Sequence, residues 1–131
     1  MKTKRILRFY FTAESLERAF QNLIEINVYN CGSDAFASAE KICSVIGDKM
    51  QLERLWAYLD GVIKEMTEKD RCALLKYSSR FGVAESDRKE CNRAVIKFTR
   101  RAWRIGAFAE DLAVLKKYYS LLRFEVPLSA G

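Results

Sequence analysis

Six of the seven basic side chains in the stretch 87–104 are the residues whose type and spacing point most directly to a function. Five of them recur every three or four positions, so on a helix they would occupy an arc of about 80°, with the sixth, Arg101, beside it. A row of cations gains affinity for nucleic acid by releasing the counterions of its phosphates. Arginine can also pair with one phosphate through two hydrogen bonds. The six residues are Lys89, Arg93, Lys97, Arg100, Arg101 and Arg104.

The opposite side of the same predicted helix is apolar, which would leave the cations facing solvent. Its members are Cys91, Val95, Phe98 and Ala102. We therefore predict a binding protein that contacts the phosphate backbone of nucleic acid through the basic helix 87–104. The alternative is an ordinary solvated face whose cations pair with the acidic residues of the middle helices. An acidic protein or an anionic lipid surface would also suit such a face.

Charge is distributed unevenly along the chain, whose net charge is +6. Residues 87–131 hold ten basic and five acidic side chains, whereas residues 31–86 hold eight basic and nine acidic ones. Trp103 lies at the flank of the basic arc. It is either exposed, where it can stack on a base or anchor a partner, or packed against the edge of the core.

Histidine is absent from the chain. Its absence excludes Ser-His-Asp and Cys-His nucleophiles, the Glu-x-x-His di-iron pattern and the H-E-x-x-H zinc proteases. No glycine-rich phosphate loop is present, and the acidic pairs sit where first-turn or solvent-facing acids are expected on helices. We expect no catalytic residues, no metal and no cofactor, and a protein that is not an enzyme.

The four cysteines, Cys31, Cys43, Cys72 and Cys91, are separated by 12, 29 and 19 residues, without a C-x-x-C pair. With no histidine available, this spacing does not form a zinc site. Three of the cysteines fall at helix positions that would face a core. We expect buried free thiols.

Two short stretches resemble the end of a sigma-factor-type helix-turn-helix. They are Ala73-Leu74-Leu75-Lys76-Tyr77, followed by Gly82, and Arg100-Arg101-Ala102-Trp103-Arg104. The resemblance implies DNA reading by a second helix in the major groove. The segment is a few residues too short, and residues 83–92 lack the small-residue turn between two short helices. We do not assign the chain to that family.

The elements that must position these residues are predicted to be helices. The chain has one proline, Pro127, and six glycines, so few residues interrupt it. Apolar residues recur with the helical period throughout, and alternation typical of strands is nowhere sustained. We predict an all-α fold in which residues 1–131 form a single-domain bundle of five to six helices.

Cap and stop signals divide the chain into these helices. Thr12 is a candidate N-cap for a helix over 13–28. Ser33 or Asp34 can cap a second helix, with the apolar stripe Ala35, Ala39, Ile42 and Ile46, that ends at Gly47. Asp48 can start a third helix, which buries Leu52, Leu55, Trp56, Leu59, Val62, Ile63 and Met66 and keeps Gly61 on its exposed side.

Residues Thr67-x-x-Asp70 form a variant capping box for a helix over 68–81, closed by Gly82. The long basic and amphipathic region 87–122 begins at Ser86 or Asp87. It is one supercoiled helix or two helices broken near Gly106. Residues 1–11 form an N-terminal arm, either extended or the short lead-in to a helix.

Two further expectations concern location and assembly. No apolar run reaches the ~20 residues of a membrane span, and Arg8 interrupts the only signal-like segment, so we expect a cytoplasmic protein without a membrane span. The second function that we consider is a protein-interaction or homo-oligomerising helical module, which uses the C-terminal stripe as a coiled-coil-like seam. Aromatic clusters near both ends (Phe9, Tyr10 and Phe11; Tyr118, Tyr119 and Phe124) belong to one core layer or to a self-association surface.

Overall fold

In a computed structural model of the chain, residues 3–29, 35–79 and 83–119 are described, with side chains for 3–26, 39–79 and 83–119. The described residues contain no strand, and the predicted all-α fold is confirmed. The elements are α1 (Thr3–Phe11), α2 (Ala13–Tyr29), α3 (Ala35–Lys64), α4 (Glu68–Ser78), the 3₁₀ helix η1 (Glu85–Asp87), α5 (Arg88–Arg101), the 3₁₀ helix η2 (Trp103–Phe108) and α6 (Ala109–Tyr119).

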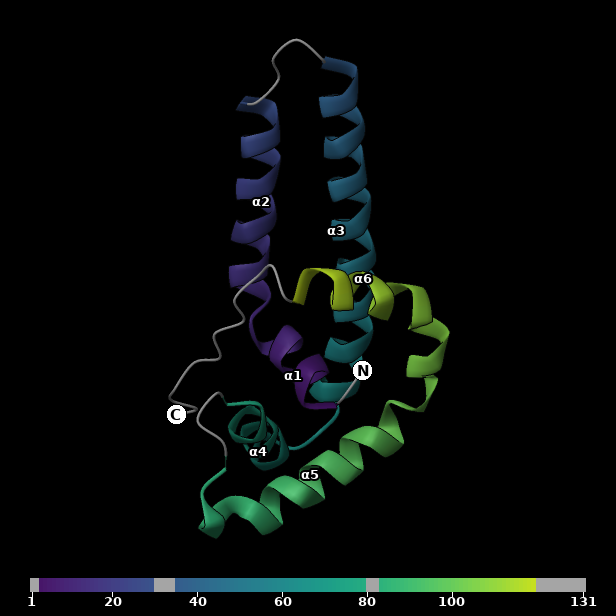
Figure 1. Cartoon of the computed structure of the whole chain (residues 1–131). Helices are drawn as coiled ribbons and strands as arrows, with labels where there is room; N and C mark the ends of the chain where they lie inside the picture. Colours follow the sequence, from purple (N-terminus) through teal and green to yellow (C-terminus); the bar gives the residue numbers. More distant parts are fainter. Residues whose placement is uncertain (1–2, 30–34, 80–82, 120–131) are drawn as a thin grey trace.

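The helices form a compact base from which one long hairpin extends. Figure 1 shows α2 and α3 side by side, with the upper part of both helices beyond the rest of the molecule. In the base, α1 packs against α4 and the lower part of α3, and α5 lies along α4 (Figure 1). The chain then turns through η2, and α6 returns across α3.

The core lies in this base and receives side chains from every α-helix. Its largest fully buried members are Leu7 and Phe9 of α1, Phe20 of α2, Leu52, Leu55, Leu59 and Ile63 of α3, Leu74 of α4 and Leu115 of α6. The α3 residues are those that the helical period predicted, except that Trp56 and Val62 are only half-buried. Phe9 and Tyr118 belong to the same core cluster, with Tyr10, Phe11 and Tyr119 packed against it. These aromatic residues are thus parts of one core, while Phe124 lies outside the described residues.

The N-terminal segment is not an extended arm but the helix α1. Ile6, Leu7 and Phe9 are buried, so tertiary packing holds this short helix in place. The role predicted for Thr12 was wrong. Its hydroxyl donates to the carbonyl oxygen of Arg8 at 2.7 Å, at the end of α1, and does not accept from the first turn of α2. The Thr12 carbonyl accepts from Leu16 at 3.0 Å and starts α2.

Gly47 does not end a helix, and the second and third predicted helices are the single helix α3. A glycine in a helix interior costs roughly 1 kcal/mol relative to alanine. This cost is too small to end a helix when the residues on both sides of the glycine are held by packing. The stripe predicted for the second helix was also wrong, because Ala39 and Ile46 are exposed and Ile42 is half-buried. Ser33 and Asp34 lie outside the described residues.

The cap predicted at Thr67 is confirmed, and the structure decides between the two alternatives for the region after Asp87. Thr67 caps α4, its hydroxyl accepting from the backbone N–H of Asp70 at 3.2 Å. The region after Asp87 is two α-helices, because η2 interrupts it across Gly106. Helix α4 ends at Ser78, three residues before the predicted 81, and Gly82 lies outside the described residues.

Two tyrosines tie helices to carboxylates of α3. Tyr10 of α1 donates to Asp60 at 2.7 Å and stacks on Trp56, with 5.4 Å between ring centroids. Tyr118 of α6 donates to Asp48 at 2.6 Å. Burial first, and then the hydrogen-bonded carboxylate, raises the pKa of each phenol well above 10.

Alkaline titration should therefore weaken the fold. Above about pH 10 the unfolded chain releases the protons of Tyr10 and Tyr118 while the folded chain retains them, so the free energy of unfolding falls as pH rises. We expect absorbance at 295 nm to show that tyrosine ionisation continues well above pH 10 and accompanies loss of helical signal. Complete ionisation of Tyr10 and Tyr118 near pH 10, with helicity intact, would contradict this.

Candidate nucleic-acid interface

Helix α5 is oriented by a buried apolar side, broadly as its sequence predicted. Cys91, Ala94, Phe98 and the following Ala102 are each at most 3% exposed. Val95 is only half-buried, and Ala94 takes the central position that we had given to Val95. The Cys91 thiol donates to the carbonyl oxygen of Ala73 in α4 at 3.4 Å, and burial raises its pKa. This side of α5 is therefore bound to α4 and faces away from solvent.

The cysteine prediction was only partly correct. Cys91 is buried and free, Cys72 is half-buried, and Cys43 is exposed. At most two of these three cysteines are turned toward the core, against the three that were expected. In the continuous helix α3, Cys43 lies away from the side that packs on α2. Cys31 lies outside the described residues.

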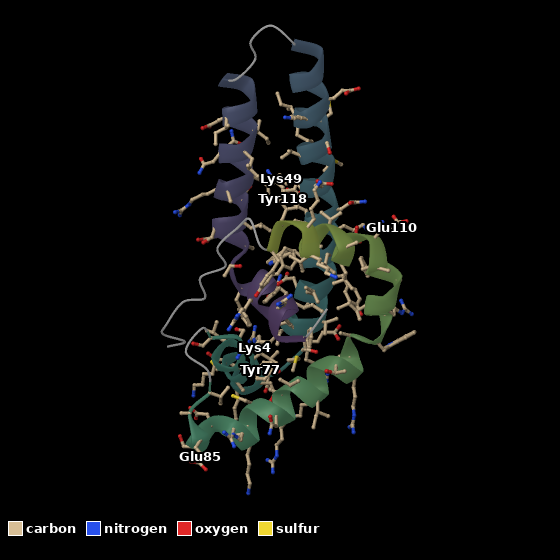
Figure 2. The ribbon with its side chains drawn as sticks, in the orientation of Figure 1. Lys4, Lys49, Tyr77, Glu85, Glu110 and Tyr118 are labelled. Atoms are coloured by element: carbon tan, nitrogen blue, oxygen red, sulfur yellow. The ribbon has the colours of Figure 1, made fainter. Side chains whose placement is uncertain are left out.

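The solvent side of α5 carries the predicted cations, but the structure divides them into two groups. Lys89, Arg93 and Arg100 are exposed and have no ion pair with any residue that the structure describes. Figure 2 shows nitrogen-tipped side chains extending from α5 away from the other helices. Lys89 and Arg100 are separated by eleven residues, or about 17 Å along the helix axis.

The other two predicted cations that lie in α5 are paired. Lys97 contacts Asp70 of α4 at 3.1 Å, and Asp70 is only 15% exposed. Arg101 lies 3.8 Å from Glu65, in a pair exposed on both sides and therefore worth little. The interpretation that middle-helix acids neutralise this face thus holds for Lys97, in part for Arg101, and not for the unpaired group.

The acidic residues at the start of α5 are themselves occupied. Glu90 pairs with Lys69 of α4 at 3.1 Å, and Asp87 pairs with Lys76 at 3.6 Å. Lysines of α4 thus hold the Asp87 carboxylate and the Glu90 carboxylate, which lies three positions before Arg93 on the same helix. Because these acidic residues pair with α4, positive charge on the outer side of α5 is left without acidic partners among the described residues.

Arg104 and Trp103 extend this surface beyond the helix. Helix α5 is capped at Ala102, so both residues belong to η2. Arg104 therefore does not continue the row of cations on α5. Trp103 is 71% exposed, which selects the exposed of its two predicted positions. The Arg104 guanidinium lies 4.9 Å from the centroid of its ring. Ile96, 52% exposed, lies on the same outer side of α5, a feature that the sequence analysis missed.

The connection between α4 and α5 differs from that of a helix-turn-helix. Helix α4 ends at Ser78 and α5 begins at Arg88, so nine residues separate them, including η1. A helix-turn-helix joins its helices through three or four residues. The resemblance of these sequences to that motif therefore does not extend to the arrangement of the helices.

The strongest ion pair in the base was not visible as a site in the sequence. Asp111 of α6 is fully buried, and Arg54 of α3 donates to its Oδ2 from Nη2 at 2.9 Å and from Nε at 3.2 Å. Arg54 also lies over the ring of Phe108, 5.4 Å from the centroid. The pair joins α6 to α3.

Other places that could hold a ligand offer little chemistry. A groove of about 460 Å³ between α1, α2 and α3 is lined largely by apolar residues such as Phe9, Phe20 and Trp56. Lys49 at its rim lies 4.0 Å from Glu17 and 3.7 Å from Glu53, so its charge is balanced. Within the described residues no group of histidine, cysteine, aspartate or glutamate side chains could hold a metal ion. No helix in this part of the chain is long and apolar enough to cross a membrane.

In comparisons with known proteins, no family model, no curated sequence and no solved structure matches the chain. The surface of α5 and η2 is therefore the candidate functional site of the described chain.

Proposed function

We propose that this protein is a non-catalytic, cytoplasmic binding protein that contacts nucleic-acid phosphates through the outer side of α5 and the start of η2. The observation that carries the proposal is the unpaired basic group, Lys89, Arg93 and Arg100, on a helix whose other side is buried. Duplex DNA carries one charge per ~1.7 Å of axis with both strands counted, so the ~17 Å between Lys89 and Arg100 spans a length of duplex that carries about ten phosphates, some of them on its far side. Contacts of this kind position a nucleic acid without reading its sequence.

Trp103 supports a contribution from unpaired bases. Base stacking on an exposed aromatic ring contributes about 1–3 kcal/mol and is largely independent of sequence. The neighbouring Arg104 guanidinium, on the Trp103 ring, is placed to reach a phosphate next to a stacked base. We therefore expect a single strand to be bound at least as tightly as a duplex.

The test is the affinity for fluorescently labelled single-stranded and duplex oligonucleotides, measured by anisotropy across a salt series. Three or four phosphate contacts predict a slope of log affinity against log salt of about −2 to −4. The variant Lys89→Glu/Arg93→Glu/Arg100→Glu should abolish binding. A matched variant, Arg18→Glu/Lys41→Glu/Lys64→Glu, changes the net charge by the same amount on exposed residues of α2 and α3. This variant should retain most of the nucleic-acid binding. No binding at low salt, or equal loss in both variants, would overturn the proposal.

A second candidate is an acidic protein partner. Ile96 and Trp103 are exposed beside the cations, and tryptophan with arginine is the combination most enriched in the centres of protein interfaces. Such a partner would be lost on Trp103→Ala and Ile96→Ala, whereas nucleic-acid binding would depend little on Ile96. The two candidates therefore separate on one substitution.

A further inference from the structure

The groove where α1, α2 and α3 meet has the size and walls of a small-molecule site. Its volume is about 460 Å³, and the sites that hold small organic molecules measure about 300–1,000 Å³. Its walls are formed largely by apolar side chains, namely Phe9 of α1, Leu16 and Phe20 of α2, and Leu52 and Trp56 of α3. The groove can therefore accommodate a ligand whose main part is a hydrocarbon.

One wall of the groove is a tryptophan ring that is held in place. Trp56 stacks on Tyr10, with 5.4 Å between ring centroids and 14° between ring planes, and its Nε1 donates to the Tyr10 carbonyl oxygen at 3.0 Å. Tyr10 covers one face of the indole but does not line the groove, so another part of the Trp56 ring does. A bound molecule meets a ring that needs no ordering, which lowers the cost of binding. Tryptophan is also the aromatic side chain that attracts cations most strongly.

The rim of the groove carries an excess of negative charge. Three lining carboxylates, those of Glu14, Glu17 and Glu53, accompany one lining ammonium group, that of Lys49, so two negative charges are in excess. Glu14 is exposed and has no ion pair with any residue that the structure describes. The whole chain carries +6, so the rim has the opposite sign to the protein as a whole. A negative rim around apolar walls attracts cations and repels anions.

Lys49 shows how this groove accepts a cation. Its ammonium nitrogen lies 4.0 Å from Glu17 and 3.7 Å from Glu53, since the side chain reaches from α3 toward α2 (Figure 2). The Lys49 side chain is only 25% exposed, so much of its hydrocarbon stem packs against its neighbours. This alkylammonium group of the chain itself offsets one charge of the rim and forms no ion pair with Glu14.

We propose that the groove binds a small organic cation, an amine or quaternary ammonium ion with an apolar body of about eight to ten carbon atoms. The body packs against Phe20, Leu52 and Trp56, and the cationic group lies among the rim carboxylates, beside Glu14. An apolar groove alone would accept any hydrocarbon, so the charge of the rim is what identifies the ligand class. This inference does not rest on the proposed nucleic-acid binding, because the groove and α5 share no residue.

Three eight-carbon probes that differ only in their end group test the charge selection. They are octylammonium, 1-octanol and octanoate at neutral pH. In the whole chain with Trp103→Phe, Trp56 is the only tryptophan, so its fluorescence reports occupancy of the groove. We expect octylammonium to bind with a dissociation constant on the order of 0.1 mM, roughly 10-fold more tightly than 1-octanol, and octanoate to bind most weakly. An unchanged Trp56 signal up to about 10 mM octylammonium, or equal affinities for the cation and the alcohol, overturns the proposal.

Two variants with opposite expected effects test the role of the rim. Glu14→Gln/Glu53→Gln removes two of the three carboxylates from exposed positions and should raise the dissociation constant for octylammonium on the order of 10-fold. Lys49→Met removes the competing ammonium group but keeps a side chain of similar length, so it should lower that constant several-fold. Glu40→Gln/Glu110→Gln is the control, because it removes the same charge from exposed residues outside the groove. Equal weakening by the two glutamine variants, or weaker binding by Lys49→Met, overturns the proposal.

Discussion

Arg54→Ala should lower the free energy of unfolding by about 3–5 kcal/mol, because it leaves the buried Asp111 carboxylate without its countercharge. Asp111 is fully buried, and its other oxygen, Oδ1, has no hydrogen-bond partner among the described residues. Arg54 thus supplies both hydrogen bonds that this carboxylate accepts there. Chemical denaturation followed by circular dichroism measures the change directly.

The same pair provides its own control. In Arg54→Met/Asp111→Leu both charges are replaced by apolar side chains of similar size, and we expect recovery of most of the lost stability. Lys64→Ala removes an exposed lysine that pairs with Asp60 of the same helix and should cost less than about 1 kcal/mol. If Arg54→Ala costs no more than Lys64→Ala, the carboxylate is not confined as the structure places it.

Phe98→Ala should be the most damaging substitution in α5, lowering the free energy of unfolding by about 3–5 kcal/mol. Phe98 is 2% exposed and is the largest side chain on the side of α5 that packs into the core. Its loss leaves a cavity between α5 and the base, so the cations on the outer side lose their fixed position. Denaturant unfolding and the oligonucleotide titration should both register the change.

Ile96→Ala is the matched substitution for Phe98→Ala. Ile96 lies two residues earlier, on the outer side of the same helix, and is 52% exposed. Its truncation should change stability by no more than about 0.5 kcal/mol. Comparable losses from the two substitutions would mean that α5 is rotated relative to the structure and that its basic row is not the outer side.

Local signals in the sequence were sufficient where a single helix decides the outcome. The Thr67 cap needs only the hydroxyl and the N–H three residues later. The buried side of α5 followed from helical spacing, although Ala94 and Val95 exchanged their predicted burial. Local signals failed where two segments compete. Gly47 resembles a stop, but the packing of α3 on α2 and α6 continues the helix through it.

The row of cations on the candidate surface was predictable from the sequence. Which of these cations have an acidic partner was not. Spacing placed Lys89, Arg93, Lys97 and Arg100 on one side of a helix. Only the packing of α4 on α5 determined that Lys97 is held by Asp70 and that Glu90 is drawn to Lys69. Ion pairs between helices depend on how the helices cross, and spacing within one helix carries no information about that.

The amino-acid sequence by itself determined that this chain is helical, where α2, α4 and α5 begin, and which side of α5 is apolar. These properties depend on contacts within a few residues, which periodicity and caps record. The tertiary structure alone decided that α3 is continuous, that Asp111 is buried against Arg54, and that Ile46 and Met50 face solvent. Those outcomes depend on which helix sides meet, and burial is settled by neighbours distant in the chain.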